Sequence, residues 1–268
     1  MSSSYSVSGQ LVDIHKREIY PARVEVADGM IRAIHRLEDA PDQFLMPGFI
    51  DAHIHIESSM LVPQQFGAVA LTHGTIATVS DPHEIANVCG VDGIDYMIRN
   101  AAGSPLKFYF GAPSCVPATP FETAGAVIDA AAIDALLSRS DIHYLAEMMN
   151  FPGVLYQDAE VMAKIASACQ HGKPVDGHAP GLRGDEAQRY AAAGITTDHE
   201  CTTLEEALDK IAAGVYILIR EGSAAKNYEA LAPLLKSHPG RVMFCSDDKH
   251  PDELVNGHIN KLVARAVA

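Results

Sequence analysis

Basic residues are scarce in this chain of 268 residues, where 20 Lys and Arg stand against 34 Asp and Glu and the formal net charge is −14. No basic run interrupts this excess, and a surface of this sign repels phosphate backbones and anionic lipid headgroups. The sequence also lacks any apolar stretch near the roughly 20 residues that span a bilayer. We therefore expect neither a nucleic-acid-binding protein nor a membrane protein.

Cysteines are few, and their spacing does not suggest pairs. The five are Cys89, Cys115, Cys169, Cys201 and Cys245, and none belongs to a C-x-x-C motif. An odd number of thiols in a chain of this size favours reduced cysteines and a cytoplasmic location. Residues 1–10 lack the basic and apolar regions of a secretory signal, so we expect no leader peptide.

The composition itself is that of a folded globular protein, with 48% hydrophobic and 20% charged residues. The first part of the chain predicts three short strands, at residues 6–12, 22–26 and 30–34, with a tight turn at Asp28-Gly29. Three strands are too few to close a core by themselves. We therefore interpret residues 1–45 as a partial β-sandwich segment of a small β domain.

From residue 46 onward, short apolar runs alternate with alanine-rich helical stretches, and this alternation predicts βαβ units around a parallel sheet. Eight strands in one domain of this length predict an α/β fold, a (β/α)8 TIM-type barrel over residues 46–268. An open doubly wound sheet is the alternative, but no G-x-G-x-x-G motif follows the first strand. The expected strands are 44–54, 75–79, 107–111, 143–148, 174–177, 194–197, 215–219 and 242–245, and the expected helices are 63–71, 89–102, 128–138, 158–171, 184–193, 204–213 and 225–237.

Four of the 13 histidines and two carboxylates fall at the carboxyl ends of these predicted strands. His53 and His55 alternate along one strand, so their side chains point the same way. In a barrel, the carboxyl ends of all strands meet at one mouth. Imidazoles and carboxylates are ligands of divalent transition metals, and one carboxylate can bridge two ions. The pattern predicts a site for one or two metal ions built from His53, His55, Glu147, His178, His199 and Asp247.

A single buried histidine is more often a satisfied core residue than a ligand, and an H-x-H motif alone is weak evidence. Six ligand-type residues at the ends of predicted strands are much less expected by chance than one such motif. The other histidines lack this placement, and for most of them a solvated or core position is the simpler interpretation: His15, His35, His73, His143, His171, His238, His250 and His258. His83 differs from these, because it lies in the loop after the second predicted strand, near the same mouth.

Several motifs resemble a known family. The segment P-G-F-I-D-A-H-I-H at 47–55 resembles the first-strand signature of the amidohydrolase superfamily. The segments H-I-E-S-S-M at 55–60, D-P-H-E-I at 81–85 and R-E-G-S-A-A at 220–225 are similar to the bacterial adenine deaminase family within it. The resemblance covers nearly the whole chain, and the combination of these three segments is far more specific than the H-x-H motif.

This resemblance implies hydrolytic deamination of adenine to hypoxanthine and ammonia by a metal-activated hydroxide. It implies a binuclear centre of Mn²⁺ or Fe²⁺, with Zn²⁺ as an alternative, in a homo-oligomeric purine-binding enzyme. Many superfamily members bridge their metals with a carbamylated lysine, whereas Glu147 stands at that position here and Lys164 lies well downstream. The carboxylate lowers the odds of a dihydroorotase or hydantoinase.

Within this mechanism, Asp247 is the expected proton acceptor, and His83 and Glu57 are the expected proton donors. The residues expected to bind the substrate are Arg220, Glu221, Asp81 and Glu84. Simpler interpretations exist for all four, because Asp81 and Glu84 suit a helix N-terminus and Arg220 and Glu221 suit an ion pair on the barrel rim.

Two other functions stay open at this point. The chain fits another amidohydrolase, one that acts on a cyclic amide or a different aminated heterocycle. It also fits an inactive, truncated metal-binding barrel, because adenine deaminases are typically much longer and this sequence stops soon after the eighth strand.

Overall fold

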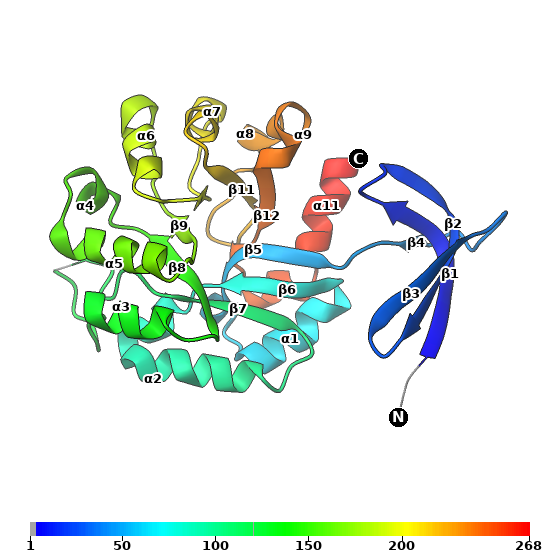
Figure 1. The fold of residues 1–268 in the computed structure, drawn as a ribbon, viewed down its shortest axis with the longest axis horizontal. Helices are drawn as coiled ribbons and strands as arrows, with labels where there is room; N and C mark the ends of the chain where they lie inside the picture. Colours follow the sequence, from blue (N-terminus) through cyan, green and yellow to red (C-terminus); the bar gives the residue numbers. More distant parts are fainter. Residues whose placement is uncertain (1–3, 120) are drawn as a thin grey trace. The chain divides into compact units, whose positions relative to one another are not determined.

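The computed structural model describes residues 4–119 and 121–268, which form two compact units that meet in the sequence between Gly48 and Phe49 (Figure 1). The first unit is a four-stranded sheet in the order β3-β2-β1-β4. Its strands are β1 (Ser4–Asp13), β2 (Glu18–Ala27), β3 (Met30–Arg36) and β4 (Phe44–Leu45).

The predicted turn at Asp28-Gly29 joins β2 and β3, which pair antiparallel. Both turn residues have positive φ, 55° for Asp28 and 72° for Gly29, as the tight hairpin turns require. The predicted strand 44–54 is wrong at its start. Phe44 and Leu45 pair with β1, and the first barrel strand begins at Phe49. Pro47 and Gly48 separate the two, and proline cannot donate to a strand ladder.

The second unit contains the predicted barrel. One sheet has the order β13-β5-β6-β7-β8-β9 and another the order β10-β11-β12, and every strand pair in both is parallel. A bridge between Val175 and Ile195 joins β9 to the second sheet. The strands are β5 (Phe49–His55), β6 (Thr75–Ser80), β7 (Lys107–Ala112), β8 (Ile142–Met148), β9 (Val175–Gly177), β10 (Thr197–Asp198), β11 (Tyr216–Arg220), β12 (Val242–Cys245) and β13 (Asp247–Asp248).

The eighth barrel strand is divided at Ser246 into β12, which pairs with β11, and β13, which pairs with β5. Asp51 holds this junction closed, because its carboxylate accepts from the Ser246 backbone N–H at 3.0 Å and from the Ser246 hydroxyl. His258 pairs with the same carboxylate at 2.8 Å. His258 and Asp51 are both buried, so this histidine has the core position expected for it.

Helices lie around the strands of the second unit, as Figure 1 shows. The longer ones are α1 (Pro63–Thr72), α2 (His83–Ala101), α3 (Ala130–Leu137), α5 (Ala159–Gln170), α6 (Gly184–Ala192), α7 (Leu204–Ala212) and α11 (Ile259–Val267). The short ones are η1 (Ile56–Ser59), α4 (Phe151–Leu155), α8 (Tyr228–Leu231), α9 (Leu234–Ser237), η2 (Pro239–Arg241) and α10 (Pro251–Leu254). None of the described helices is long and apolar enough to cross a membrane.

Two helix predictions need correction. The helix expected at 225–237 is broken into α8 and α9, and Pro233 stands at the break because its ring cannot continue a helix. The helix expected at 89–102 starts earlier, at His83, with a kink at Gly90 where φ is 61°. The other predicted helices are confirmed within a few residues, and Asp129, Asp158 and Thr203 cap three of them by accepting a backbone N–H.

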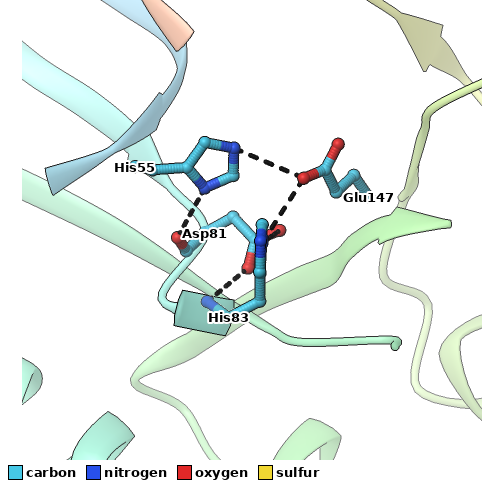
Figure 2. A group of neighbouring side chains, drawn as sticks. All are labelled: His55, Asp81, His83 and Glu147. Atoms are coloured by element: carbon cyan, nitrogen blue, oxygen red, sulfur yellow. Dashed lines mark hydrogen bonds and ion pairs between the residues drawn. The ribbon is translucent and has the colours of Figure 1, made fainter. Parts of the chain in front are cut away.

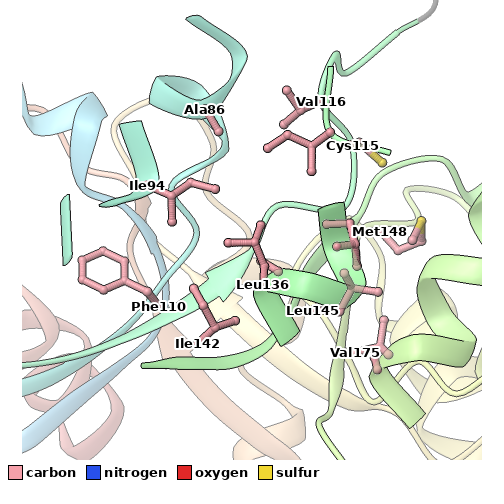
Figure 3. Close-up of a cluster of buried hydrophobic side chains, with 14 of the residues drawn as sticks. Ala86, Ile94, Phe110, Cys115, Val116, Leu136, Ile142, Leu145, Met148 and Val175 are labelled. Atoms are coloured by element: carbon pink, nitrogen blue, oxygen red, sulfur yellow. The ribbon is translucent and has the colours of Figure 1, made fainter. Parts of the chain in front are cut away.

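The hydrophobic core lies between the strands and their covering helices. Figure 3 shows one part of it, where Ile94 of α2, Phe110 of β7 and Leu145 of β8 are buried together. A second cluster joins β11 to α7, α8 and α11 through side chains such as Ile217 and Leu231. This packing makes the barrel a rigid support for the loops at the carboxyl ends of its strands.

Candidate metal centre

All six predicted metal ligands lie at the carboxyl ends of barrel strands and are brought together. His53 and His55 end β5, Glu147 lies near the end of β8, and Asp247 begins β13. His178 directly follows β9 and His199 directly follows β10. Ligand atoms from overlapping groups of these residues lie within 4.8 Å of one another. The location is the barrel mouth at which such folds carry their sites.

Glu147 stands at the centre of the cluster, and its two oxygens face different histidines. Oε2 lies 2.6 Å from His178 Nδ1 and 3.2 Å from His199 Nε2. Oε1 lies 3.3 Å from His55 Nε2 and 3.4 Å from His83 Nδ1. This is the arrangement expected of a carboxylate that bridges two ions.

Lys164 is engaged elsewhere. Its ammonium donates to the backbone oxygens of Ser114 at 2.9 Å and Ile128 at 2.8 Å. A carbamylated lysine therefore has no counterpart at Lys164, and the carboxylate of Glu147 is the bridging group that the chain offers.

His53 and His55 present their Nε2 atoms to the same cluster. The two atoms are 3.1 Å apart, and Asp247 Oδ1 lies 3.7 Å from His53 Nε2 and 3.4 Å from His55 Nε2. Each ring is oriented from its other nitrogen: Asp176 accepts from His53 Nδ1 at 2.8 Å, and the backbone oxygen of Asp81 accepts from His55 Nδ1 at 3.1 Å. Such contacts fix the tautomer that leaves Nε2 free for a metal.

These separations fit metal coordination. Two donor atoms that hold one ion at about 2.1 Å in tetrahedral geometry lie about 3.4 Å apart. The separations of Glu147 from His55, His83 and His199, at 3.2 to 3.4 Å, lie near this value, whereas the 2.6 Å contact with His178 is that of a hydrogen bond. The donor set of imidazole nitrogens and carboxylate oxygens also suits a divalent transition metal.

The electrostatics of the cluster favour a cation. Burial alone lowers the pKa of the His55 imidazole, but Asp247 and Glu147 raise it well above its usual value. The pKa of His199 is raised in the same way by Glu147 and Glu200 against the effect of burial. The buried carboxylates thus favour positive charge near them, and a divalent metal would supply that charge while the imidazoles stay neutral.

The loops after β5 and β6 contribute a second group of side chains. Figure 2 shows Asp81 and His83 beside His55 and Glu147. His83 Nδ1 lies 3.1 Å from Asp81 Oδ2, and the pKa of His83, which burial lowers, is raised to about 9 by Asp81. Asp81 also accepts from the His83 backbone N–H at 3.0 Å, so the carboxylate contacts both the first residue of α2 and the cluster.

Glu57 and Glu84 lie next to this group. Glu57 accepts from the Ile85 backbone N–H at 3.2 Å, and burial raises its pKa to about 7. Glu84 accepts from the Ser58 hydroxyl at 3.2 Å, and the same hydroxyl donates to Asp248. The structure therefore brings Asp81 and His83 into the cluster of candidate ligands, whereas Glu57 and Glu84 lie beside them and are not among the grouped residues.

Arg220 and Glu221 are already engaged with protein groups. Arg220 donates to Glu200 and to Asp247, whereas Glu221 accepts from the backbone N–H of Tyr228 at 3.2 Å and pairs with Arg265 at 3.1 Å. Their predicted contacts with a purine stay predictions, and Glu221 is not among the residues grouped at the metal cluster.

Three residues of the site were not expected from the sequence. Glu200 lies 3.3 Å from His199 Nε2, Asp176 orients His53, and Asp248 joins the group at His55. Each is adjacent to a predicted ligand or alternates with one, as in the segments D-G-H at 176–178 and D-H-E at 198–200. The sequence signal that could have identified these three residues is an acidic side chain one or two positions from a predicted ligand at a strand end.

Comparisons with known proteins agree with this geometry. The sequence model described as "Amidohydrolase family" matches residues 44–267. Solved structures with the same fold include N-acetylglucosamine-6-phosphate deacetylase from Pasteurella multocida, with a TM-score of 0.60 at 16% identity over 91% of this chain and 71% of that one. Another is 5-methylcytosine deaminase from Klebsiella pneumoniae, with a TM-score of 0.58 at 12% identity over 91% and 75%.

Curated relatives are much more similar in sequence. A protein named adenine deaminase from Salinibacter ruber is 58% identical over 267 residues, which cover 100% of this chain and 49% of that protein. A relative with the same name from Sulfurovum sp. is 58% identical over 96% of this chain and 48% of that protein. Another from Borreliella burgdorferi is 52% identical over 98% of this chain and 49% of that protein. The chain spans about half the length of these relatives. With the family match over most of its length and a metal-type cluster at the barrel mouth, the chain belongs to the amidohydrolase family.

Proposed function

We propose that this chain carries the catalytic barrel of an adenine deaminase, which hydrolyses adenine to hypoxanthine and ammonia with the help of divalent metal ions. The observation that carries the proposal is the 58% identity, across the whole chain, to a relative of that name. The cluster around Glu147 supports it, because hydrolysis of an aromatic amine needs an activated water.

The residues that would hold two metal ions are His53, His55, Glu147, His178, His199 and Asp247. Divalent ions in such a site supply a nucleophile at neutral pH by lowering the pKa of water. The fitting ions are Mn²⁺ or Fe²⁺, with Zn²⁺ as the alternative. We also propose a homo-oligomer in the cytoplasm, on the strength of the family resemblance and of the cysteine pattern.

Asp247 is the proposed general base. Its pKa is shifted in two directions: burial raises it, and the hydrogen bond with His55 and the charges of the neighbouring histidines lower it below its usual value. Its Oδ1, which lies 3.7 Å from His53 Nε2 and 3.4 Å from His55 Nε2, is the oxygen placed to accept the proton. From there the proton would pass to the exocyclic nitrogen of adenine, which must leave as ammonia.

His83 and Glu57 are the proposed proton donors to the purine ring. Both hold a proton near neutral pH, since the pKa of His83 is raised to about 9 by Asp81 against burial and that of Glu57 to about 7 by burial. Asp81 and Glu84 would help to bind the purine edge, because purine ring N–H and amino groups are donors that carboxylates accept.

The test measures metal content and ammonia release from adenine for the 268-residue chain, beside Asp247→Asn and an exposed control, Asp252→Asn. We expect Asp247→Asn to keep its metal and to lose about 10²- to 10⁴-fold in turnover, the usual contribution of a general base. The control should match the wild type.

Three outcomes would contradict parts of this proposal. Full activity of Asp247→Asn would exclude the proton transfer. Ring-opened products without ammonia would favour another amidohydrolase reaction on a cyclic amide. Bound metal with no turnover of adenine or of other heterocycles would favour an inactive metal-binding barrel.

A further inference from the structure

We propose that Arg220 is a positioning residue, which holds Glu200 and Asp247 in place with one guanidinium group so that Asp247 keeps a single oxygen turned to the metal cluster. The inference rests on the proposed function, in which Asp247 is the base. In this proposal Arg220 binds two carboxylates of the protein, whereas the sequence led us to expect that it contacts the purine.

The contacts of Arg220 reach both carboxylates at once. Nη1 donates to Glu200 Oε1 at 2.5 Å and to Asp247 Oδ2 at 2.6 Å, and Nη2 donates to Glu200 Oε2 at 2.9 Å. All three side chains are buried. A planar guanidinium with several fixed donors suits this task, because a lysine ammonium cannot reproduce the fork.

Asp247 needs such an external contact to fix its side chain. Its φ is 55°, in the left-handed region, and it directly follows the break between β12 and β13. The regular alternation of a strand therefore does not set the direction of its carboxylate. With Oδ2 held by Arg220, Oδ1 is the oxygen left to face His53 and His55, at 3.7 and 3.4 Å.

Glu200 shows what Arg220 restrains on the other side of the cluster. Glu200 Oε1 lies 3.5 Å from His178 Nδ1 and 3.3 Å from His199 Nε2, two of the nitrogens that also face Glu147. Without the guanidinium, Glu200 and Asp247 would be two buried carboxylates with no shared counter-charge. Both would then be free to turn further toward a bound ion and to crowd its open coordination positions.

The test compares Arg220→Ala with Arg139→Ala in the 268-residue chain. Arg139 is a matched control, because it also joins two carboxylates, with 2.7 Å to Asp95 and 2.9 Å to Asp141, but belongs to the α3–β8 connection. For Arg220→Ala we expect kcat to fall about 10- to 100-fold, the usual effect of losing a contact that orients a ligand, with little change in KM.

Two further readouts separate positioning from a purely structural role. Millimolar guanidinium should restore kcat of Arg220→Ala, since it can fill the vacated place between the two carboxylates, whereas methylammonium should not. Co²⁺ bound to Arg220→Ala should be retained, with weaker visible absorption than in the wild type, because freed carboxylate oxygens raise its coordination number. Arg139→Ala should show neither effect.

The proposal is overturned if guanidinium gives no recovery, if the Co²⁺ spectrum is unchanged, or if Arg139→Ala loses the same activity. A wild-type chain that releases no ammonia from adenine would refute the proposed function instead. The Co²⁺ spectra of Arg220→Ala would then still decide whether the guanidinium sets the positions of Glu200 and Asp247.

Discussion

Lys210→Met should strongly destabilise the chain, because Lys210 is the buried counter-charge of two carboxylates. Its ammonium on α7 donates to Asp198 at 3.0 Å, to Glu206 at 2.9 Å and to the backbone oxygen of Ala179 at 2.6 Å. The side chains of Lys210, Asp198 and Glu206 are 1%, 0% and 2% exposed. Removing one partner of a buried ion pair typically costs about 3–5 kcal/mol.

The two carboxylates do more than pair with the lysine. Asp198 accepts the backbone N–H groups of Ala179 and Glu200, both at 2.9 Å. Glu206 accepts those of Gly181 at 2.8 Å and Thr202 at 3.1 Å. Buried ion pairs can often be replaced by apolar residues without loss. Here such a replacement would leave the buried N–H groups of Ala179 and Glu200 unpaired, at about 1–3 kcal/mol each, and would also remove the acceptor of the part-buried N–H groups of Gly181 and Thr202.

We therefore expect the triple variant Lys210→Met, Asp198→Leu, Glu206→Leu to be less stable than Lys210→Met alone. The assay is urea unfolding at neutral pH, followed by circular dichroism, on wild type and variants. Lys173→Met is the matched control, because Lys173 donates to three backbone oxygens and has no carboxylate partner among them.

Two results would refute this reasoning. One is a loss of less than about 1 kcal/mol for Lys210→Met, well below the usual cost of breaking a buried pair. The other is a triple variant as stable as the wild type. Either would mean that the loops carrying His178 and His199 do not depend on this network.

Three further predictions concern the metal-free or weakly loaded protein. Glu57→Gln should remove one contribution to the pH dependence of stability. Because burial raises the pKa of Glu57 from 4.5 to about 7, its carboxyl group contributes about 3 kcal/mol of stability at low pH that is lost as the pH rises to 7. In thermal melts with a chelator, the unfolding free energy of the variant should therefore fall less over this range than that of the wild type. Asp176→Asn should weaken Mn²⁺ binding about 10- to 100-fold, because His53 loses the carboxylate that accepts from its Nδ1. Titration calorimetry measures this affinity, and an unchanged value would contradict the orienting role of Asp176. His258→Leu should cost about 3–5 kcal/mol in urea unfolding by leaving Asp51 without its buried partner, and a near-neutral effect would count against that pair.

The barrel fold and the positions of the six candidate ligands at its mouth were predictable because both depend on local patterns. Short apolar runs alternating with helical stretches identify strands, and a histidine or acid at the end of such a run needs only the barrel topology to reach the mouth. The structure confirms the fold on these grounds. The role of each ligand in metal binding stays a prediction, although Glu147 lies between the expected histidines.

The contacts that orient the candidate ligands were not predictable from the sequence. They depend on which strands are neighbours in the barrel and on how far along each strand a side chain lies. The pairing of Asp176 with His53 joins residues 123 positions apart, and that of Ser246 with Asp51 joins residues 195 apart. The broken helix at Pro233 shows a different limit. Its periodic apolar residues suggest one element, and only the local geometry of proline divides it.

Protons and metal ions compete for the same nitrogens in this cluster. Without metal, Glu147 and Asp247 raise the pKa of His55 well above its usual value despite burial, so its imidazole carries a proton at neutral pH. A bound divalent ion must displace that proton, since only the neutral imidazole can donate a lone pair. The carboxylates therefore serve both states: they stabilise protonated histidines in the empty site and metal charge in the occupied one. Arg220 adds a positive charge that neither state displaces, beside the carboxylates of Glu200 and Asp247.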